Sequence, residues 1–289
     1  MNLLGKLLLP IIIPLKFMQD NFKAILIVLI VFFLFAPNAK NELNKNNLLE
    51  ISLIGPIMEV SEILEKIEKA TTQNSIKGVL LVVDSPGGAV APSVELAYAI
   101  KRLQKRKPVV IYAKGTIASG SYYASIWANE IIANPGSMVG SIGVIMQGAD
   151  LSKLMETIGV KTQTIQAGKY KQVGTSSRKW KEYEVNELQK VTQGTYDMFT
   201  QDVANARKLD IAKRDIYANA HIFTAKQAKD VGLIDFIGVK YDAKEHLIAL
   251  SKVDKAIWNK EDKFDKLIKK LSATTALTLH TYFPTLILK

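Results

Sequence analysis

The sequence contains no cysteine among its 289 residues and only three histidines. The absence of cysteine excludes disulfides, thiolate metal sites and a cysteine nucleophile, but it fits either redox compartment. His221 precedes a predicted short strand and His246 falls on a predicted amphipathic helix, while His280 lies near the carboxyl end. None of the three lies in a segment that resembles a catalytic loop, so a Ser-His-Asp triad is poorly supported. We predict no metal site and no cofactor.

Charge of one sign is not gathered in any long block, although the formal net charge is +11. Such a balance suits an anionic partner, either nucleic acid or a lipid headgroup surface. The basic residues are scattered and no nucleic-acid-binding motif accompanies them, so we predict no nucleic-acid partner. Hydrophobic residues make up 48% of the chain, enough for a folded core. The length fits one large domain or two small ones.

Residues 24–37 form an uninterrupted apolar run, AILIVLIVFFLFAP. The run is shorter than the roughly 20 residues that span a bilayer as a helix. Phe22 and a snorkelling Lys23 can extend it, which predicts an anchor helix over about residues 22–37. A cleaved signal peptide is the alternative, because an apolar core of this length also suits one. We favour the uncleaved anchor because the following residues, APNAK, contain no convincing A-x-A cleavage site.

The residues before this run predict its orientation. The apolar residues 7–17 are interrupted by two prolines and a lysine, so we assign them to the membrane interface. Lys6, Lys16 and Lys23 precede the main run, which favours an amino terminus in the cytoplasm. We therefore predict a single-pass membrane protein, with residues 1–37 membrane-associated and the rest of the chain outside the cytoplasm.

Hydrophobic patterning beyond the anchor predicts alternating strands and helices. Residues 38–47 are polar and read as a linker, residues 48–251 as one domain, and residues 252–289 as a basic and then apolar tail. The predicted strands cover residues 48–58, 77–84, 108–113, a short stretch near 131, 139–146, 161–166 and 231–236. The predicted helices cover residues 61–71, 93–105, 118–129, 150–159, 180–208, 224–230 and 242–251. This alternation predicts an α/β domain with a largely parallel sheet.

Two glycine-containing segments are candidates for chemistry. Ser85-Pro86-Gly87-Gly88 follows a buried strand, and exposed N–H groups at such a turn can stabilise an oxyanion. Taken alone, this segment is better explained as an ordinary strand-to-helix turn. Ser119 lies at the start of a predicted helix, where the Gly120 N–H points into the same space, and a hydroxyl there could be a nucleophile or only an N-cap.

A serine nucleophile needs a base, and with cysteine absent and histidine poorly supported, lysine is the remaining class. Burial in an apolar pocket lowers the pKa of a lysine, and the neutral amine then accepts the serine proton. The segment 168–172 offers Lys169 and Lys171. Composition does not select between the two.

Four motifs carry a resemblance to a known family. They are Asp84-Ser85-Pro86-Gly87-Gly88, Ala118-Ser119-Gly120-Ser121-Tyr122-Tyr123, Gly140-Ser141-Ile142-Gly143-Val144-Ile145 and Gly168-Lys169-Tyr170-Lys171. In order and spacing they resemble the bacterial signal peptide peptidase family, peptidase family S49, in its short single-repeat form, over residues 48–249. The resemblance implies the spiral β-β-α fold of the Clp protease and crotonase superfamily.

The same resemblance implies the roles of five residues. Ser119 would be the nucleophile, Lys171 its base, Gly88 and Gly120 the oxyanion-hole donors, and Ser141 the residue that orients the lysine amine. Two departures from the family pattern are visible. Ser121 stands where a second glycine is common, and residues 220–224 lack the usual glycine and arginine at their start.

The implied function is a membrane-anchored serine endopeptidase that degrades remnant signal peptides and other apolar peptides in or near the membrane. The resemblance also implies a location in the bacterial inner (cytoplasmic) membrane, with the catalytic domain on the periplasmic or extracytoplasmic side. The family's short members form oligomers in which neighbouring protomers complete each site, so we expect a homo-oligomer. A lysine base should work best at neutral to alkaline pH. Three alternatives remain: a related membrane Ser-Lys protease that trims a membrane scaffold protein, a crotonase-like acyl-CoA enzyme, and a non-enzymatic membrane scaffold.

Overall fold

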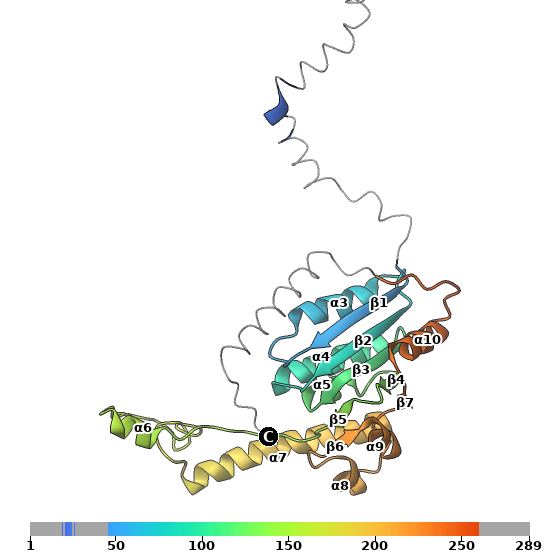
Figure 1. Cartoon of the computed structure of the whole chain (residues 1–289). Coiled ribbons are helices and arrows are strands. Elements are labelled where there is room, and N and C mark those ends of the chain that lie inside the picture. Colours follow the sequence, from blue (N-terminus) through green and yellow to red (C-terminus); the bar gives the residue numbers. More distant parts are fainter. Residues whose placement is uncertain (1–18, 20, 25, 27–45, 260–289) are drawn as a thin grey trace, which may run out of the picture. The chain divides into compact units, whose positions relative to one another are not determined.

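The structure is a computed structural model that describes residues 19, 21–24, 26 and 46–259 (Figure 1). The chain divides into two units, residues 1–45 and 46–289. Within the described ranges, no helix combines the length and the apolar character needed to cross a bilayer. Most of the predicted anchor (22–37), most of the linker (38–47) and most of the tail (252–289) lie outside the described residues. Those assignments therefore stay predictions.

A parallel sheet forms the centre of the second unit. Its main strands run in the order β1-β2-β3-β4-β7, and every neighbouring pair is parallel. These strands are β1 (Leu48–Ile54), β2 (Gly78–Ser85), β3 (Val109–Ala118), β4 (Glu130–Ala133) and β7 (Phe236–Ile237). Two short strands extend the far end of β3: β5 (Met138–Gly140) pairs with it in parallel, and β6 (Ile222–Thr224) pairs with β5 in antiparallel fashion. The predicted α/β domain with a largely parallel sheet is therefore confirmed.

Helices cover both faces of this sheet, which explains why β2 has no polar alternation. Val79, Leu81 and Val83 belong to the core that also contains residues of α3 (Ser61–Thr72) and α4 (Val90–Gln104). Leu80 and Val82 belong to a second core on the opposite face, where α10 (Lys240–Ser251) packs. Because side chains alternate between faces along a strand, burial on both sides requires a continuous apolar run.

The strands that approach the candidate site are shifted by a local irregularity. Val83 pairs with Ala113, but Ser85 pairs with Ile117, so β3 contains extra residues there. The Thr116 N–H donates to the Asp84 carboxylate at 3.0 Å. A Cβ at Gly115 would lie 2.5 Å from an Asp84 oxygen, so a side chain there would displace the Asp84 carboxylate. Such bulges redirect a strand, and this one directs the end of β3 toward Ser119.

The remaining helices follow β3 or surround its end. They are α5 (Gly120–Ser125), α6 (Ser152–Thr157), α7 (Glu182–Arg207), the 3-10 helix η2 (Ile211–Lys213), α8 (Arg214–Tyr217) and α9 (Ala225–Asp230). Residues 141–181, which we call the arm, run from β5 to the amino end of α7, and α6 lies at its outer end (Figure 1).

The arm corrects one secondary-structure prediction. Residues 161–166 were expected to form a strand, but they carry no strand pairing, and Ile165 is fully exposed. A strand needs a neighbour for its backbone groups, and this stretch has none within the described chain. β5 and α5 are also shorter than predicted. Ser141 has φ 50° directly after β5, and Ser119 has φ 54° directly before α5, so the backbone turns at both places.

Candidate active site

Ser119 occupies a strained position between β3 and α5. Its φ of 54° and ψ of −123° lie where L-residues are uncommon, at a cost of about 1–3 kcal/mol. Its N–H donates to the Gly140 carbonyl at 2.8 Å, and its carbonyl accepts the Tyr123 N–H at 2.9 Å. Its side chain makes no capping hydrogen bond to α5. Backbone contacts therefore hold Ser119 in this conformation, and a capping role does not explain its hydroxyl.

Glycines surround Ser119 because no side chain fits there. A Cβ at Gly87, which has φ +92°, would lie 2.6 Å from the Gly120 nitrogen. A Cβ at Gly88 would lie 2.1 Å from the carbonyl oxygen of Ile57. Gly120 is also closely surrounded, since a Cβ there would lie 2.2 Å from the Ser93 hydroxyl oxygen and 3.3 Å from the Gly88 nitrogen. The two predicted oxyanion donors, Gly88 and Gly120, are thus neighbours.

The N–H groups of these two glycines are available. Neither donates a backbone hydrogen bond within the described part of the chain, although the adjoining Ala89 N–H donates to Ile57 at 2.8 Å. The first N–H groups of a helix lack an intrahelical acceptor, which accounts for Gly120. Two adjacent free donors beside a serine hydroxyl form the arrangement that can stabilise an oxyanion.

Ser121, which departs from the family pattern, ties the two strand ends together. Its hydroxyl donates to the Ser85 carbonyl at 2.7 Å and accepts the Ala118 N–H at 2.9 Å. The side chain is fully buried. The serine therefore bridges the end of β2 to the end of β3, where Ala118 precedes Ser119, and its hydroxyl is occupied by these bonds.

A cavity of about 90 Å³ adjoins this cluster. Ser119, Gly88 and Gly120 all line it, so the structure brings these three predicted residues together. Its other lining residues are Val90, Ser93, Val94, Tyr123, Gly143, Val144, Ile145, Thr195, Met198 and Phe199. Our sequence reasoning missed the wall from α7, although Thr195, Met198 and Phe199 have the i, i+3, i+4 spacing of one helix face. Periodicity marks such a face but not what it covers.

Ser141 lies next to the cluster without lining the cavity. It follows Gly140, whose carbonyl binds the Ser119 N–H, and its own N–H donates to the His221 carbonyl at 2.7 Å. A Cβ at Gly140 would lie 2.7 Å from that same carbonyl oxygen. The half-buried Ser141 is therefore held one residue away from the backbone that positions Ser119.

Lys171 lies on the arm, in turns that follow Gly168, and its side chain is exposed. It does not line the cavity that contains Ser119. The neighbouring Lys169 differs, because its ammonium lies 4.7 Å from the ring centroid of Tyr183 and 5.6 Å from that of Tyr170. The rings attract the Lys169 cation, whereas no ion pair, side-chain hydrogen bond or ring contact of Lys171 exists among the described residues. Of the two lysines, Lys171 has the free amine.

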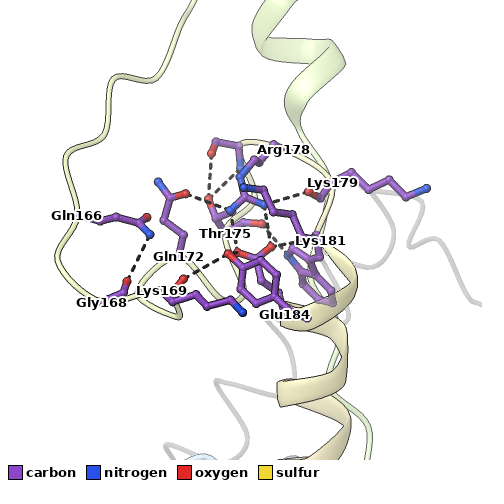
Figure 2. Close-up of polar contacts among 12 residues, drawn as sticks. Gln166, Gly168, Lys169, Gln172, Thr175, Arg178, Lys179, Lys181 and Glu184 are labelled. Carbon is purple, nitrogen blue, oxygen red and sulfur yellow. Dashed lines mark hydrogen bonds and ion pairs between the residues drawn. The ribbon is translucent and has the colours of Figure 1, made fainter.

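An ion pair anchors the segment between Lys171 and α7 (Figure 2). Arg178 donates to both carboxylate oxygens of Glu184, at 2.8 and 2.7 Å, and also to Gln172 at 3.0 Å. Glu184 is fully buried and accepts the Lys181 N–H at 2.8 Å, as in a capping box. The Arg178 bonds first, and the Lys181 N–H next, lower the pKa of Glu184 to about 2. The loop that carries Lys171 is thus fastened to the first turn of α7.

The described histidines have other contacts. The His246 ring lies 2.7 Å from a Glu130 oxygen and packs on Phe236 at 4.6 Å between centroids. His221 contributes its backbone carbonyl to Ser141, and its ring lies 6.1 Å from that of Phe223. Neither histidine lines the Ser119 cavity. His280 lies outside the described residues.

The parallel sheet, the bulge in β3 and the cluster around Ser119 define an α/β protein of the Clp protease and crotonase type. Its candidate nucleophile, with Gly88 and Gly120 beside it, lies where the strands end. Among solved structures, a serine-to-alanine mutant of a membrane-bound stomatin-specific protease superimposes with a TM-score of 0.52 at 14% identity, covering 76% of this chain and all of that one. The predicted fold class is confirmed. The profile of Peptidase family S49 matches residues 101–254, more than half of the chain. The chain belongs to this family, as its motifs indicated.

Several curated relatives carry protease names. A putative protease of Methanocaldococcus jannaschii is 43% identical over 180 residues, which are 62% of this chain and 58% of that protein. A putative signal peptide peptidase SppA of Enterococcus faecium is 36% identical over 180 residues, 62% of this chain and 52% of that protein. Protease 4 of Salmonella typhi is 32% identical over 180 residues, 62% of this chain and 29% of that protein. The match thus spans about half of the first two relatives and under a third of the Salmonella protein.

Proposed function

We propose that the protein is a membrane-anchored serine endopeptidase in which Ser119 is the nucleophile and Lys171 the general base. The observation that carries the proposal is the strained, uncapped Ser119 beside the free N–H groups of Gly88 and Gly120, in an apolar cavity. Strain at one non-glycine residue persists where its surroundings over-determine it, as at catalytic nucleophiles. Membership of peptidase family S49 supports the same chemistry.

The proposed reaction is acyl transfer to Ser119. The neutral Lys171 amine accepts the proton of the Ser119 hydroxyl, and the oxygen attacks a peptide carbonyl. The N–H groups of Gly88 and Gly120 donate to the resulting oxyanion. Lys171 then gives its proton to the leaving amine, and water hydrolyses the acyl-enzyme with Lys171 again as base. Ser141 is proposed to hold the lysine amine by a hydrogen bond during these steps.

Lys171 is proposed to act on the Ser119 of a neighbouring copy. Within one chain Lys171 lies on the exposed arm and does not line the Ser119 cavity. The arm also exposes large apolar side chains; for Ile145, Leu154, Ile158 and Ile165 the exposed fractions are 83%, 58%, 63% and 103%. Apolar side chains exposed this densely mark an interaction surface. Packing of the arm on a second copy would cover them and complete the site.

The proposed substrates are remnant signal peptides and other apolar peptides in or near the membrane. The cavity beside Ser119 is small, about 90 Å³, and its walls include Val90, Val94, Met198 and Phe199. Such a pocket favours small or aliphatic side chains, because a charged group would lose its hydration there without a partner.

Peptide hydrolysis by the full-length protein tests the dyad. We expect Ser119→Ala and Lys171→Ala to lose nearly all activity on apolar peptides, because each removes one member of the nucleophile–base pair. Lys169→Ala is the matched control, two residues from Lys171 on the same loop, and it should keep most activity. Full activity of Lys171→Ala would contradict the proposal, and loss confined to Lys169→Ala would reassign the base.

Mixing the two inactive variants tests whether the site forms between copies. If Lys171 acts on a neighbour, co-assembled Ser119→Ala and Lys171→Ala subunits regain about a quarter of the wild-type sites when subunits mix at random. Mixing Ser119→Ala with a Ser119→Ala/Lys171→Ala double variant is the control and regains none. No recovery in the first mixture, with subunit exchange verified, would place the dyad within one chain.

A further inference from the structure

Basic residues gather where the chain enters the sheet. We define the basic turn patch as Lys77, Arg102, Lys105, Arg106 and Lys107. Three of them, Arg102, Lys105 and Arg106, line one groove between α3 and α4. Lys77 lies just before β2, and Lys107 lies in the turn before β3. Burial first, and then the positive charges of Lys77 and Arg106, lower the pKa of Lys107, so these cations are close neighbours.

The cations of this patch are not neutralised within the described residues. None of the five forms an ion pair with a carboxylate there, and Glu68 is the acidic residue that shares the groove. Lys107 alone is engaged, since its ammonium donates to the carbonyls of Ala70 and, at 2.6 Å, of Gln73, where α3 ends. The side chains of Lys77, Arg102, Lys105 and Arg106 are exposed to solvent. A cluster of repelling, exposed cations favours an anionic partner.

The patch lies at one defined end of the sheet. The Lys77 N–H donates to the carbonyl of Asn47 at 2.7 Å, directly before β1 begins. Asn47, through which the chain enters this unit, therefore lies beside the patch. Because β1, β2 and β3 are parallel, their amino ends share this edge. The candidate active site, which follows the carboxyl ends of β2 and β3, lies at the opposite edge.

We propose that the basic turn patch binds anionic phospholipid headgroups and so orients the domain on its bilayer, with the active site at the distal edge. This goes beyond the proposed peptidase activity and rests on its membrane-anchor part. Each Lys or Arg near an anionic membrane strengthens binding about fivefold, and salt screens the effect within a Debye length. β2 has 8 residues, and at about 3.3 Å per residue the site stands roughly 25 Å from the headgroups. Parts of an apolar peptide that extend this far from the bilayer surface would reach it.

A site-directed spin label on the full-length protein tests the contact. The chain has no cysteine, so Asn74→Cys, at an exposed position between α3 and Lys77, carries the label uniquely. In bilayers containing phosphatidylglycerol, we expect the accessibility of this label to a water-soluble relaxation agent to fall severalfold relative to pure phosphatidylcholine. High salt should reverse the change. A label at Asn205→Cys, exposed on α7, should not respond.

Charge reversal identifies the residues responsible. Lys105→Glu/Arg106→Glu should abolish the lipid-dependent change at the Asn74 label, whereas Lys213→Glu/Lys226→Glu, with the same net charge, should preserve it. Equal accessibility in the two bilayers, or an equal response of both double variants, would overturn the proposal. If duplex DNA but not phosphatidylglycerol lowers the accessibility of the Asn74 label, the proposal is also overturned and the patch is assigned to nucleic acid. Flotation with phosphatidylcholine vesicles reports the anchor separately, and peptide hydrolysis reports the proposed activity.

Discussion

Gly120→Ala tests whether packing around the candidate oxyanion hole requires glycine. The new Cβ would lie 2.2 Å from Ser93 Oγ and 3.0 Å from Ser93 Cβ. Forcing an extra methyl into packed surroundings costs about 1–3 kcal/mol. Movement of the Gly120 N–H would also weaken oxyanion binding, and loss of one such donor lowers kcat about 10²–10³-fold.

The clash has a specific relief, because its shortest contact is to the Ser93 hydroxyl. Ser93→Ala removes this oxygen and loses only its bond to the Ala89 carbonyl, 2.8 Å away, which also accepts the Ser93 N–H. We expect that single change to cost about 0.5–1.5 kcal/mol. The double variant should then lose less unfolding free energy than the two single variants lose in sum. We expect this coupling energy to be about 1 kcal/mol or more.

Urea unfolding and peptide hydrolysis of the wild type, both single variants and the double variant measure this coupling. Ser93→Ala should restore part of the kcat lost in Gly120→Ala. Gly194→Ala is the matched control. Inside α7 its Cβ would meet no atom within 4 Å apart from the neighbouring backbone of the helix itself, so it should stabilise the fold by about 1 kcal/mol. If the stability losses of the two single variants sum to the loss of the double variant within about 0.5 kcal/mol, the steric reasoning is refuted.

Two further predictions concern backbone strain and an ion pair. Ala220 has φ 58°, so Ala220→Gly should stabilise the protein by about 0.5–1 kcal/mol in urea unfolding, because glycine adopts this conformation freely; a loss of stability would contradict the strain. The pKa of Glu184 is lowered to about 2, so its contribution is present above the unfolded value of about 4.3 and is lost as the pH falls toward 2. Limited proteolysis with a protease active in acid should therefore cut residues 166–181 faster as the pH falls from 5 to about 2. The Glu184→Gln variant should be cut fast at every pH. A cutting rate of the wild type that does not change with pH would refute this assignment.

Strands buried on both faces were the most predictable part of the fold. Residues 79–83 and 108–113 are continuous apolar runs, and both became central strands, because helices on each side of a sheet leave no polar face. The prediction for residues 161–166 was wrong, because β-branched residues favour an extended backbone but do not determine whether a partner strand is present. The exposed arm offers these residues no partner among the described ones.

The candidate site also has a part that the sequence predicted and a part that it did not. Local sequence identified Ser119 and the glycines beside it, because the backbone at this strand end requires small residues. The absence of cysteine also excluded a cysteine nucleophile. The bulge at Asp84 and the α7 wall of the cavity depend on residues far apart in the chain, so only the tertiary structure decided them. The choice of Lys171 over Lys169 stays a prediction from the family resemblance, because neither lysine lines the Ser119 cavity and Tyr183 contacts Lys169 alone of the two. Local backbone conformation depends on residues that are adjacent in the sequence, whereas the surroundings of a side chain depend on which distant segments pack against it.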